Sequence, residues 1–377
     1  MGFSVRALAA GDVGKFINCQ WQFYRNDPNW VPPLKMDRRK LLDTKKNPFY
    51  QHAEIQLFLA EDGNQILGRI AAITNELHNQ THNDNVGFFG FFECVKDQQV
   101  AKALVDSASA WLLGKGKTHV RGPVNPSMND ECALLVDGFD TPPRVLMTYN
   151  PPYYADLLEG CGFHKVKDLY AYDIDRQDYR SEKLERMQEL IRTRYDITIR
   201  EVDFKNKAQF RRDIDTIKMI YNEAWENNWG FVKLTDEEFD FLAADLKMIA
   251  NPKLTYFVEM KGKTVGFFLA LPDINQQLIH NRGGGILGGA WHLMTKKSKV
   301  DTARIIIMGV LPEYRRTGAD AVMYYEVGRR VDELGMRYGE ASWILEDNVE
   351  MRQALQRAMH AELSKTYRIY EKPLTGR

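Results

Sequence analysis

Apolar residues along this chain follow two patterns, the alternation of strands and the spacing of helices. Short alternating runs open FSVRALAAGDVGKF and ITIREVDFKNKAQF, and a helix start follows each of them. The runs LFLAEDGNQILGRIAAI and YFVEMKGKTVGFFLALP each contain two strands around a glycine-containing turn, which predicts a β-hairpin. The run RIIIMGVL predicts a strand that ends at Pro312 and precedes a helix. These patterns predict an α/β protein, in which a mixed sheet is flanked by helices.

The same order of elements occurs twice along the chain. Five pairs of segments align when the chain is shifted by 194 to 199 residues, pairing Arg6 with Arg200, Trp30 with Trp229, Gly68 with Gly266, Asn150 with Asn348 and Tyr172 with Tyr370. Hairpins resemble one another in many proteins, but agreement over five separate segments favours a repeat. Residues 1–175 and 197–377 are therefore predicted to be two copies of one α/β unit. The charged segment 176–196 has apolar residues at helical spacing and is predicted to be a linker helix.

Composition narrows the class of protein. The chain has 377 residues, more than one hydrophobic core usually holds, which favours two domains. Lys+Arg and Asp+Glu both number 51, so no global field favours nucleic acid and an anion site must be local. The four cysteines lack CxxC spacing, which argues against a zinc ribbon. Neither a signal peptide nor a long apolar run is evident, so a cytoplasmic location is expected, with contact to a membrane surface left open.

The most informative motif is MGVLPEYRRTGAD at residues 308–320, where a predicted strand is followed by a helix. A helix N-terminus offers unpaired backbone N–H groups and a partial positive charge, which suits a pyrophosphate. Gly318 allows close approach of the backbone, and Arg315 and Arg316 add charge-assisted hydrogen bonds. Asp320 opposes this interpretation, because its carboxylate would repel an anion, and it is predicted to point away. The alternative is a solvated basic turn before a surface helix.

The first copy lacks this motif. When Leu104 is aligned with Met323, Lys96-Asp97-Gln98-Gln99 stands in place of Arg315-Arg316-Thr317-Gly318. The glycine is missing and an acid is present, so this loop is not expected to hold a pyrophosphate. The first unit is therefore predicted to be a degenerate copy, retained for structure or for the acceptor side of a site.

The order of elements and the segment GVLPEYRRTG resemble the GNAT superfamily of acyl-CoA-dependent N-acyltransferases. The tandem arrangement, with WVPPL, NPFYQHAE, GFFGFFE, GPVNPSMNDE, DGFDTPP, YNPPYY and KTYRIYEKP, is similar to the bacterial branch of ceramide-synthase-like acyltransferases. The resemblance covers nearly the whole chain and implies two tandem GNAT-like domains. It also implies that acyl-CoA (coenzyme A as the leaving group) is a substrate, that no metal takes part, and that the acceptor is an amine, with a long-chain amine as a candidate.

The resemblance places the donor in the second unit. It implies that coenzyme A is bound by Leu311, Arg315, Arg316, Thr317, Gly318, Ala319 and Asn348. The backbone N–H of Val310 is the candidate that polarises the thioester carbonyl, and Gly309 is predicted to permit a bulge beside it. Arg315 and Gly318 match the spacing of the family pattern, whereas Asp320 stands where that pattern has glycine or alanine. Asn348 either contacts the pantetheine arm or only caps the helix that follows.

Several residues are candidates for moving protons. The tyrosine that serves as general acid in many relatives falls here at Leu355, so Tyr367 is a candidate instead. Tyr367 and Tyr370 alternate, however, and alternating tyrosines are common packing residues on strands. Glu346 is the candidate base, and Glu340 and Glu93 are the other possibilities.

A polar, turn-rich loop lies in the first unit, in GPVNPSMNDECALLVDGFDTPP. Its residues Asn129, Asp130 and Glu131 are predicted to orient or deprotonate the amine in a cleft between the domains, and turn formation alone is the alternative. Residues 283–288, GGGILG, match a dinucleotide motif without the strand that should precede it, so a flap over the acyl chain is predicted instead.

Other functions stay open on the sequence alone. One is a non-catalytic acyl-CoA-binding or interaction protein. Another is a transferase whose donor is an acyl carrier protein or an aminoacyl-tRNA. The protein is expected to be a monomer or a homodimer.

Overall fold

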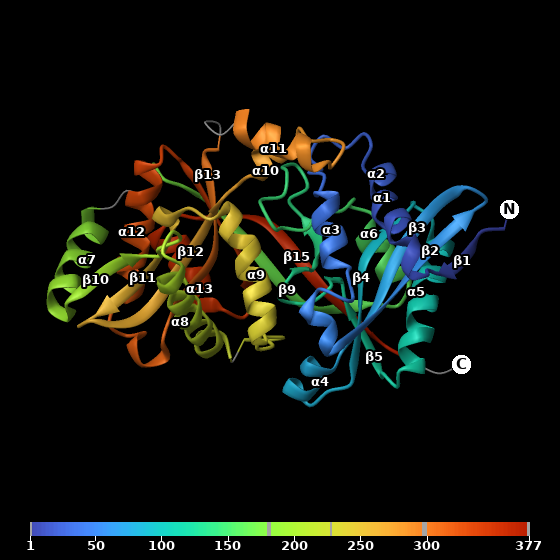
Figure 1. Cartoon of the computed structure of the whole chain (residues 1–377), viewed down its shortest axis with the longest axis horizontal. Helices are drawn as coiled ribbons and strands as arrows, with labels where there is room; N and C mark the ends of the chain where they lie inside the picture. Colours follow the sequence, from blue (N-terminus) through green and yellow to red (C-terminus); the bar gives the residue numbers. More distant parts are fainter. Residues whose placement is uncertain (1, 179–181, 227, 296–299, 375–377) are drawn as a thin grey trace. The chain divides into compact units, whose positions relative to one another are not determined.

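A computed structural model of the chain describes residues 2–178, 182–226, 228–295 and 300–374 (Figure 1). The chain forms two compact units. The first contains Met1–Leu169, Gln277–Lys297 and Lys365–Arg377, and the second contains Tyr170–Gln276 and Ser298–Ser364. Strands β9 (His164–Asp175) and β15 (Glu362–Pro373) have residues in both units. Two segments of the predicted second copy, 277–297 and 365–377, therefore pack with the first unit.

The first unit is built on a mixed sheet. Its strands follow the order β1 (Ser4–Ala7), β2 (Ala53–Asp62), β3 (Gln65–Asn75), β4 (Val86–Cys94), β5 (His119–Gly122) and β15, and β8 (Leu134–Asp137) also pairs with β15. The β4–β5 pair is parallel, and the other pairs are antiparallel. Strands β6 (Val124–Asn125) and β7 (Glu131–Cys132) form a separate antiparallel pair.

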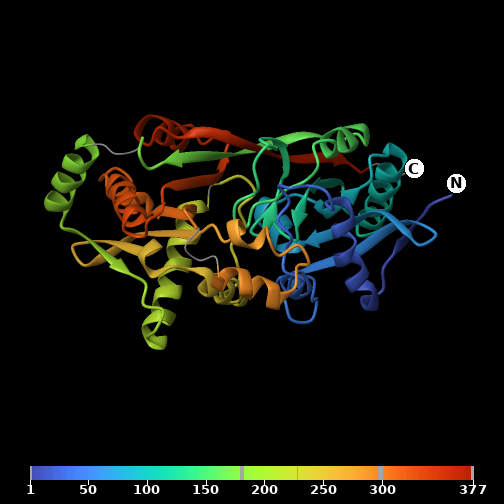
Figure 2. The ribbon, with the colours of Figure 1, turned by 90° about the horizontal axis from the view of Figure 1, so that it is seen from above.

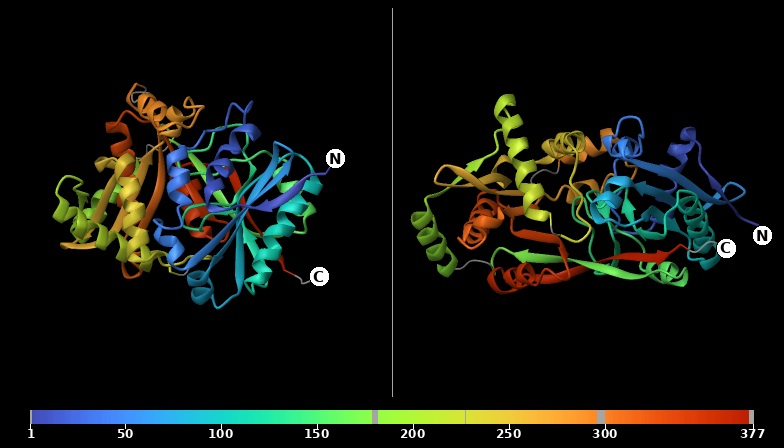
Figure 3. Two further views of the ribbon diagram at one scale, coloured as in Figure 1. Left: turned by 45° about the vertical axis from the view of Figure 1, so that its right-hand side comes forward. Right: turned by 90° about the horizontal axis from the view of Figure 1, so that it is seen from below.

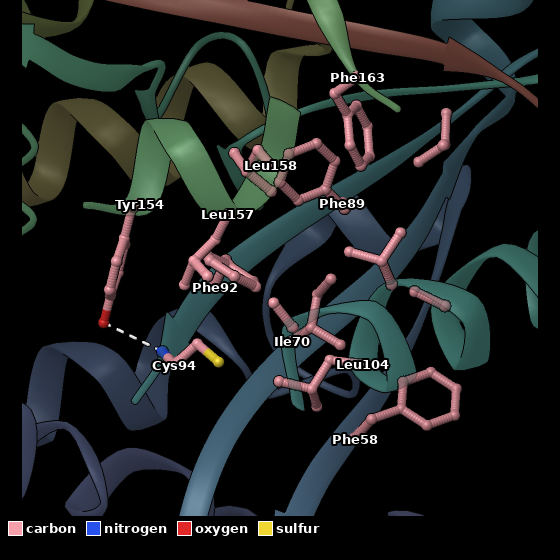
Figure 4. Close-up of a cluster of buried hydrophobic side chains, with 14 of the residues drawn as sticks. Phe58, Ile70, Phe89, Phe92, Cys94, Leu104, Tyr154, Leu157, Leu158 and Phe163 are labelled. Atoms are coloured by element: carbon pink, nitrogen blue, oxygen red, sulfur yellow. Dashed lines mark hydrogen bonds between the residues drawn. The ribbon is translucent and has the colours of Figure 1, made fainter. Parts of the chain in front are cut away.

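Helices cover both faces of this sheet. The helices of this unit are α1 (Val13–Asn18), α2 (Gln20–Phe23), α3 (Lys35–Leu41), α4 (Glu76–His82), α5 (Gln98–Gly114), α6 (Tyr154–Gly160) and α11 (Ile286–Thr295), and α10 (Asn275–Leu278) has residues in both units. Helix α5 packs on β2 and β3 from one side, and α1 contacts β2 from the other (Figure 3). The core between α5, α6 and the sheet is aromatic and aliphatic, and Phe58, Phe89 and Leu104 are among its buried side chains (Figure 4).

The second unit has a sheet of the same design. Its strands follow the order β14 (Tyr338–Leu345), β13 (Thr302–Val310), β12 (Lys263–Pro272), β11 (Thr255–Met260) and β10 (Ile197–Glu201), and only β13–β14 is parallel among these pairs. The helices are α7 (Glu182–Tyr195), α8 (Lys207–Trp225), α9 (Asp236–Ile249), α12 (Ala319–Glu333) and α13 (Val349–Ala358). Helices α8 and α12 pack on opposite faces of the sheet (Figure 2). Helix α7 lies in the predicted linker segment.

Details of strand register match between the units. The hairpin β2–β3 has a bulge directly after the pair Ala60–Gly68, and β11–β12 has one directly after Val258–Gly266. Both glycines allow a helix to approach the sheet. A Cβ on Gly68 would lie 2.6 Å from Leu104 Cδ1, and one on Gly266 would lie 2.9 Å from Met323 Cε. The predicted α/β class with a mixed sheet is confirmed, and Gly68 and Gly266, which the sequence aligned, occupy equivalent positions.

Candidate active site

Strands β13 and β14 separate towards their carboxyl ends. Their parallel pairing runs from Thr302–Tyr338 to Ile305–Ala341 and stops there, although β13 continues to Val310. Strand β14 changes direction just past this point, because Trp343 has a φ of 60°, a conformation that a bulky residue rarely adopts. Beyond Ile305, the edge of β13 that faces β14 therefore has no strand partner among the described residues. Residues 305–308 are accordingly only half-buried. The second unit therefore has an open split between two parallel strands.

The backbone of Val310 faces this split. Leu311 N donates to Val265 O at 2.9 Å, so this pair is hydrogen-bonded across β12 and β13. In an antiparallel pair, hydrogen-bonded and non-hydrogen-bonded positions alternate, so the N–H and C=O of Val310 point away from β12. This direction agrees with the predicted role of Val310 as a donor to a thioester carbonyl.

The irregularity in β13 does not lie at Gly309. The register between β12 and β13 shifts between Leu269–Ile307 and Ala270–Ile305, so Ile306 is the extra residue. Gly309 has a different role, because a Cβ there would lie 2.4 Å from a ring carbon of Trp225 on α8. The glycine allows the indole to pack against the strand.

An eight-residue loop, 311–318, connects β13 to α12. It begins with buried Leu311 and a single 3-10 turn at Pro312–Tyr314, and the Thr317 hydroxyl donates to Tyr314 O at 2.7 Å. Gly318 is the N-cap residue of α12, with φ 84°, and no side chain caps this helix. The left-handed conformation explains the glycine. With Ala319 buried behind it, the loop presents an uncapped helix N-terminus, the feature that binds phosphate groups in many proteins.

The two arginines of the loop have different surroundings. Arg315 Nη2 donates to Ala224 O at 2.9 Å, and its Nε donates to Val310 O at 3.4 Å, so it ties the loop to α8 and β13. The Arg316 side chain is exposed, and no residue in the described part of the chain pairs with its guanidinium. Asp320 is also exposed, in the first turn of α12. Arg316 is thus the cation available to a ligand.

A buried cluster lies where the split begins. Arg304 is only 1% exposed, and its Nε donates to Ser342 Oγ at 2.7 Å. Its guanidinium lies 4.8 Å from the centre of the Trp343 ring and 3.8 Å from the Glu340 carboxylate. Glu340, one of the alternative bases, is fully buried beside this arginine. The cluster holds the bend of β14, and no pattern in the sequence predicted the contact between Arg304 and Trp343.

The predicted residues after β14 lie at the start of α13. Asn348 Oδ1 accepts a hydrogen bond from Met351 N at 3.2 Å, which is the capping role. Glu346 is half-buried, and its carbonyl accepts from Arg352 Nη1 at 2.7 Å. The position at which many relatives have a tyrosine is occupied on α13 by Leu355, and this side chain is buried.

A tyrosine that the sequence did not single out reaches α13 from another helix. The hydroxyl of Tyr324, on α12, lies 3.5 Å from Met351 Sδ. Burial, together with the charge of Asp320, raises the pKa of this hydroxyl, which keeps it protonated. Tyr324 therefore carries its proton at neutral pH, although the raised pKa also makes the hydroxyl a weaker acid.

The remaining predicted residues belong to the first unit. Tyr367 is fully buried on β15, opposite Leu135 of β8, which favours the packing interpretation. Glu131 accepts from Arg38 Nη2 at 2.7 Å, and Asp130 accepts from the Ser127 hydroxyl at 2.6 Å. Val310, the loop 311–318, Glu346 and Asn348 lie in the second unit, and Tyr367 and Glu131 lie in the first; the roles of all these residues stay predictions.

In the first unit, groups of the chain itself occupy the positions equivalent to this site. Cys94 pairs with Gly68 as Val310 pairs with Gly266, and the N–H of Cys94 donates to the Tyr154 hydroxyl at 3.0 Å (Figure 4). Phe91 N donates to Asn125 Oδ1 at 2.6 Å, and all of β4 is buried. The Asp97 carboxylate caps α5 by accepting from Gln99 N at 2.7 Å. The first unit therefore closes both the split and the helix N-terminus.

The residues that fill this split form a buried polar network around Glu93. Its carboxylate accepts from the hydroxyls of Tyr24 and Tyr154, both at 2.8 Å, from Gln20 Nε2 at 2.9 Å and from Arg69 Nη2 at 3.3 Å. Burial raises the pKa of Glu93, while Arg69 and the hydrogen-bond donors act in the opposite direction. Glu93 is thus engaged on every side by the unit's own residues.

Two further observations concern ligands and membranes. In the described ranges, no three His, Cys, Asp or Glu side chains gather where they could hold a metal ion. None of the described helices combines the length and apolar character that crossing a membrane requires.

Comparison with known proteins identifies the family. The chain is 35% identical over 380 residues to Protein YghO of Escherichia coli strain K12, with 97% of this chain and 94% of that protein covered. It is 34% identical over 373 residues to the bacterial ceramide synthase of Caulobacter vibrioides, covering 96% and 95%. No family model matches the chain.

Among solved structures, a tandem GNAT protein from the clavulanic acid biosynthesis pathway aligns over the whole of both chains, with a TM-score of 0.57 and 11% identity. At that identity the likeness establishes the fold, including its tandem form. With two relatives above 30% identity over nearly their full length, the chain belongs to the family of tandem GNAT-fold acyltransferases that includes the bacterial ceramide synthase of Caulobacter vibrioides.

Proposed function

We propose that this protein is an acyl-CoA-dependent N-acyltransferase whose donor binds in the second unit. The observation that carries the proposal is the open split between β13 and β14 beside the uncapped N-terminus of α12. The pyrophosphate would bind the backbone N–H groups of Gly318 and Ala319 and the exposed Arg316, because Thr317 N already donates to Tyr314 O at 3.1 Å. The pantetheine arm would lie along the unpaired edge of β13, near Leu311 and Asn348, with Arg315 fixing the loop from behind.

The geometry suggests how the reaction proceeds. The N–H of Val310 would donate to the thioester oxygen and stabilise the charge that develops when the amine nitrogen attacks the carbonyl carbon. The C–S bond then breaks, the new C–N bond stays, and the proton lost by the amine balances the one gained by the coenzyme A thiolate. No cysteine lies in the second half of the chain, which favours direct attack. Glu346 is the proposed base, and Tyr324 joins Tyr367 as a candidate acid.

The acceptor is proposed to be an amine, and a long-chain amine is the specific candidate. The similarity to a protein named bacterial ceramide synthase supports this choice. Asn129, Asp130 and Glu131 remain the proposed acceptor-side residues.

A non-catalytic acyl-CoA-binding protein is the second candidate. The observation that favours it is the buried Leu355 on α13. This leucine stands at the position where the family resemblance places the tyrosine that acts as general acid. A donor carried by an acyl carrier protein or tRNA is the third.

One experiment separates these functions. Thermal unfolding is measured with acetyl-, medium-chain and long-chain acyl-CoA, and thiol release is then followed with candidate amines. The transferase should be stabilised by acyl-CoA and should release thiol only when an amine is present. Arg316→Glu should abolish the stabilisation, and Lys96→Glu, a charge reversal in the corresponding loop of the first unit, should preserve it. Stabilisation without turnover would support the binding protein, and no stabilisation by any acyl-CoA would refute the proposal.

A further inference from the structure

Helix α11 exposes its largest apolar side chains. Leu287 is 85% exposed, Met294 71%, Trp291 62% and Ile286 48%, and their spacing places them on one side of the helix. The opposite side carries glycine. A Cβ on Gly289 would lie 2.9 Å from Leu34 Cδ2, so this side packs closely on the first unit. The helix therefore exposes its large apolar side chains to solvent and packs a glycine against the first unit, whereas a surface helix usually buries its apolar side.

The segment before α11 is fixed to the N-terminal part of the first unit (Figures 1 and 3). Gly284 O accepts from Lys35 N at 2.9 Å, and Arg282 O accepts from Trp21 Nε1 at 2.8 Å. Arg282 itself donates to the carbonyl of Trp30 at 2.9 Å. These bonds favour a fixed platform for the exposed stripe rather than the mobile flap expected from the glycines.

The stretch of sequence that contains α11 carries charged side chains of one sign. Residues 274–300 contain no Asp or Glu, whereas they include Arg282, Lys296, Lys297 and Lys299. The chain as a whole is neutral, so this stretch is a local excess of positive charge. An apolar stripe with cationic neighbours is the combination that binds anionic lipid surfaces.

We propose that α11 docks the protein on an anionic membrane surface, with Ile286, Leu287, Trp291 and Met294 inserted between the headgroups. At ten residues the helix is about 15 Å long, half the thickness of the hydrocarbon layer, so it lies in the interface. A second copy of the chain fits less well. Two acid-free stretches would oppose like charges, and four side chains are a small fraction of a stable interface of about 800 Å² per partner.

Vesicle co-sedimentation tests the proposal on the full-length protein. The wild type should bind vesicles rich in phosphatidylglycerol, and should bind phosphatidylcholine vesicles at least about tenfold more weakly. Leu287→Ser with Met294→Ser should reduce binding at least about tenfold. Leu190→Ser with Met248→Ser, at positions 72% and 74% exposed in the second unit, is the matched control and should bind like the wild type.

Fluorescence gives an independent readout of the inserted face. Vesicles should shift the emission of the wild type to the blue and protect it from a soluble quencher. Trp291→Phe should keep binding while losing most of that shift. Equal losses in both double variants, or no binding to anionic vesicles at low salt, would overturn the proposal. A further outcome would also overturn it: the wild type is a dimer, Leu287→Ser with Met294→Ser converts it to a monomer, and vesicle binding does not change. The stripe would then be an interface between two copies of the chain. These outcomes do not depend on acyl transfer.

Discussion

The two strand–helix junctions of this chain start from the same backbone pairing and end differently. Val95 N donates to Leu67 O in the first unit, and Leu311 N donates to Val265 O in the second, both at 2.9 Å. Three residues then lead to α5 and eight lead to α12. The shorter junction places an Asp carboxylate on the helix N-terminus, whereas the longer one leaves this terminus to a glycine.

This difference separates the proposed donor site in the second unit from its structural counterpart in the first. Each polar group that could serve a donor in the second unit has a counterpart in the first that already has a partner. The N–H of Cys94 bonds Tyr154, the N–H of Phe91 bonds Asn125, and Asp97 caps α5. Buried backbone groups must be satisfied, so a unit without a ligand satisfies them internally. These internal partners, together with the change in the loop sequence, support the prediction that the first unit is a degenerate copy.

The strongest test converts the second junction into the first. Gly318→Asp would place a carboxylate at the N-cap of α12, where it would accept hydrogen bonds from the N–H groups of residues 320 and 321 and stand beside the proposed pyrophosphate. Acyl-CoA affinity, measured by calorimetry, should fall at least about 100-fold, since the helix terminus gains a side-chain cap and the site gains a repulsive charge.

Gly318→Ala is the control for backbone strain. Alanine adopts φ 84° poorly, and its Cβ would lie 2.6 Å from Ile191 Cδ1, so stability should fall in both variants. Only the aspartate should remove most donor binding. Equal affinities for the two variants would show that strain, rather than occupation of the helix terminus, had weakened the site.

A smaller effect distinguishes the two arginines. Arg316→Ala should weaken acyl-CoA binding about tenfold with little change in melting temperature, because it removes a charge-assisted bond to the ligand alone. Arg315→Ala should instead lower the free energy of unfolding by about 1–3 kcal/mol, because Ala224 O and Val310 O lose a charged donor. Thermal melts and ligand titrations on both variants check this. If Arg315→Ala weakened ligand binding and Arg316→Ala lowered stability, Arg315 would be the ligand-binding arginine and Arg316 the structural one.

The sequence predicted the repeat, the mixed sheets and the uncapped N-terminus of α12, because these depend on periodicity and on local turn chemistry. It treated Arg315 and Arg316 as equivalent, because the partner of Arg315 comes from α8, 91 residues earlier in the chain. The bond between Tyr154 and Cys94 spans 60 residues and was missed for the same reason. Local patterns specify which groups a loop offers, whereas tertiary contacts decide which of them are already engaged.

The next prediction concerns the first junction. Asp97→Ala removes two hydrogen bonds at the N-terminus of α5 and should lower the free energy of unfolding by about 1 kcal/mol. Acyl-CoA should stabilise this variant as much as the wild type, since the proposed donor site lies in the other unit. Denaturant unfolding with and without ligand measures both quantities. A new acyl-CoA site, seen as a second binding event, would mean that Asp97 alone had kept the first unit closed.

The smallest expected effect is a pH dependence set by the network that fills the first unit. Burial raises the pKa of Glu93 above its unfolded value, so the folded chain holds this proton more tightly than the unfolded chain. The contribution of Glu93 to stability is therefore greatest below the unfolded pKa, and it declines as pH rises towards the folded pKa. Glu93→Gln cannot titrate and should lack this decline. Its absolute stability should be lower, because Arg69 loses its charge partner, so the comparison rests on the slope of unfolding free energy against pH. Parallel slopes for the two proteins would mean that Glu93 stays ionised in the folded state, with Arg69 and the two tyrosines outweighing its burial.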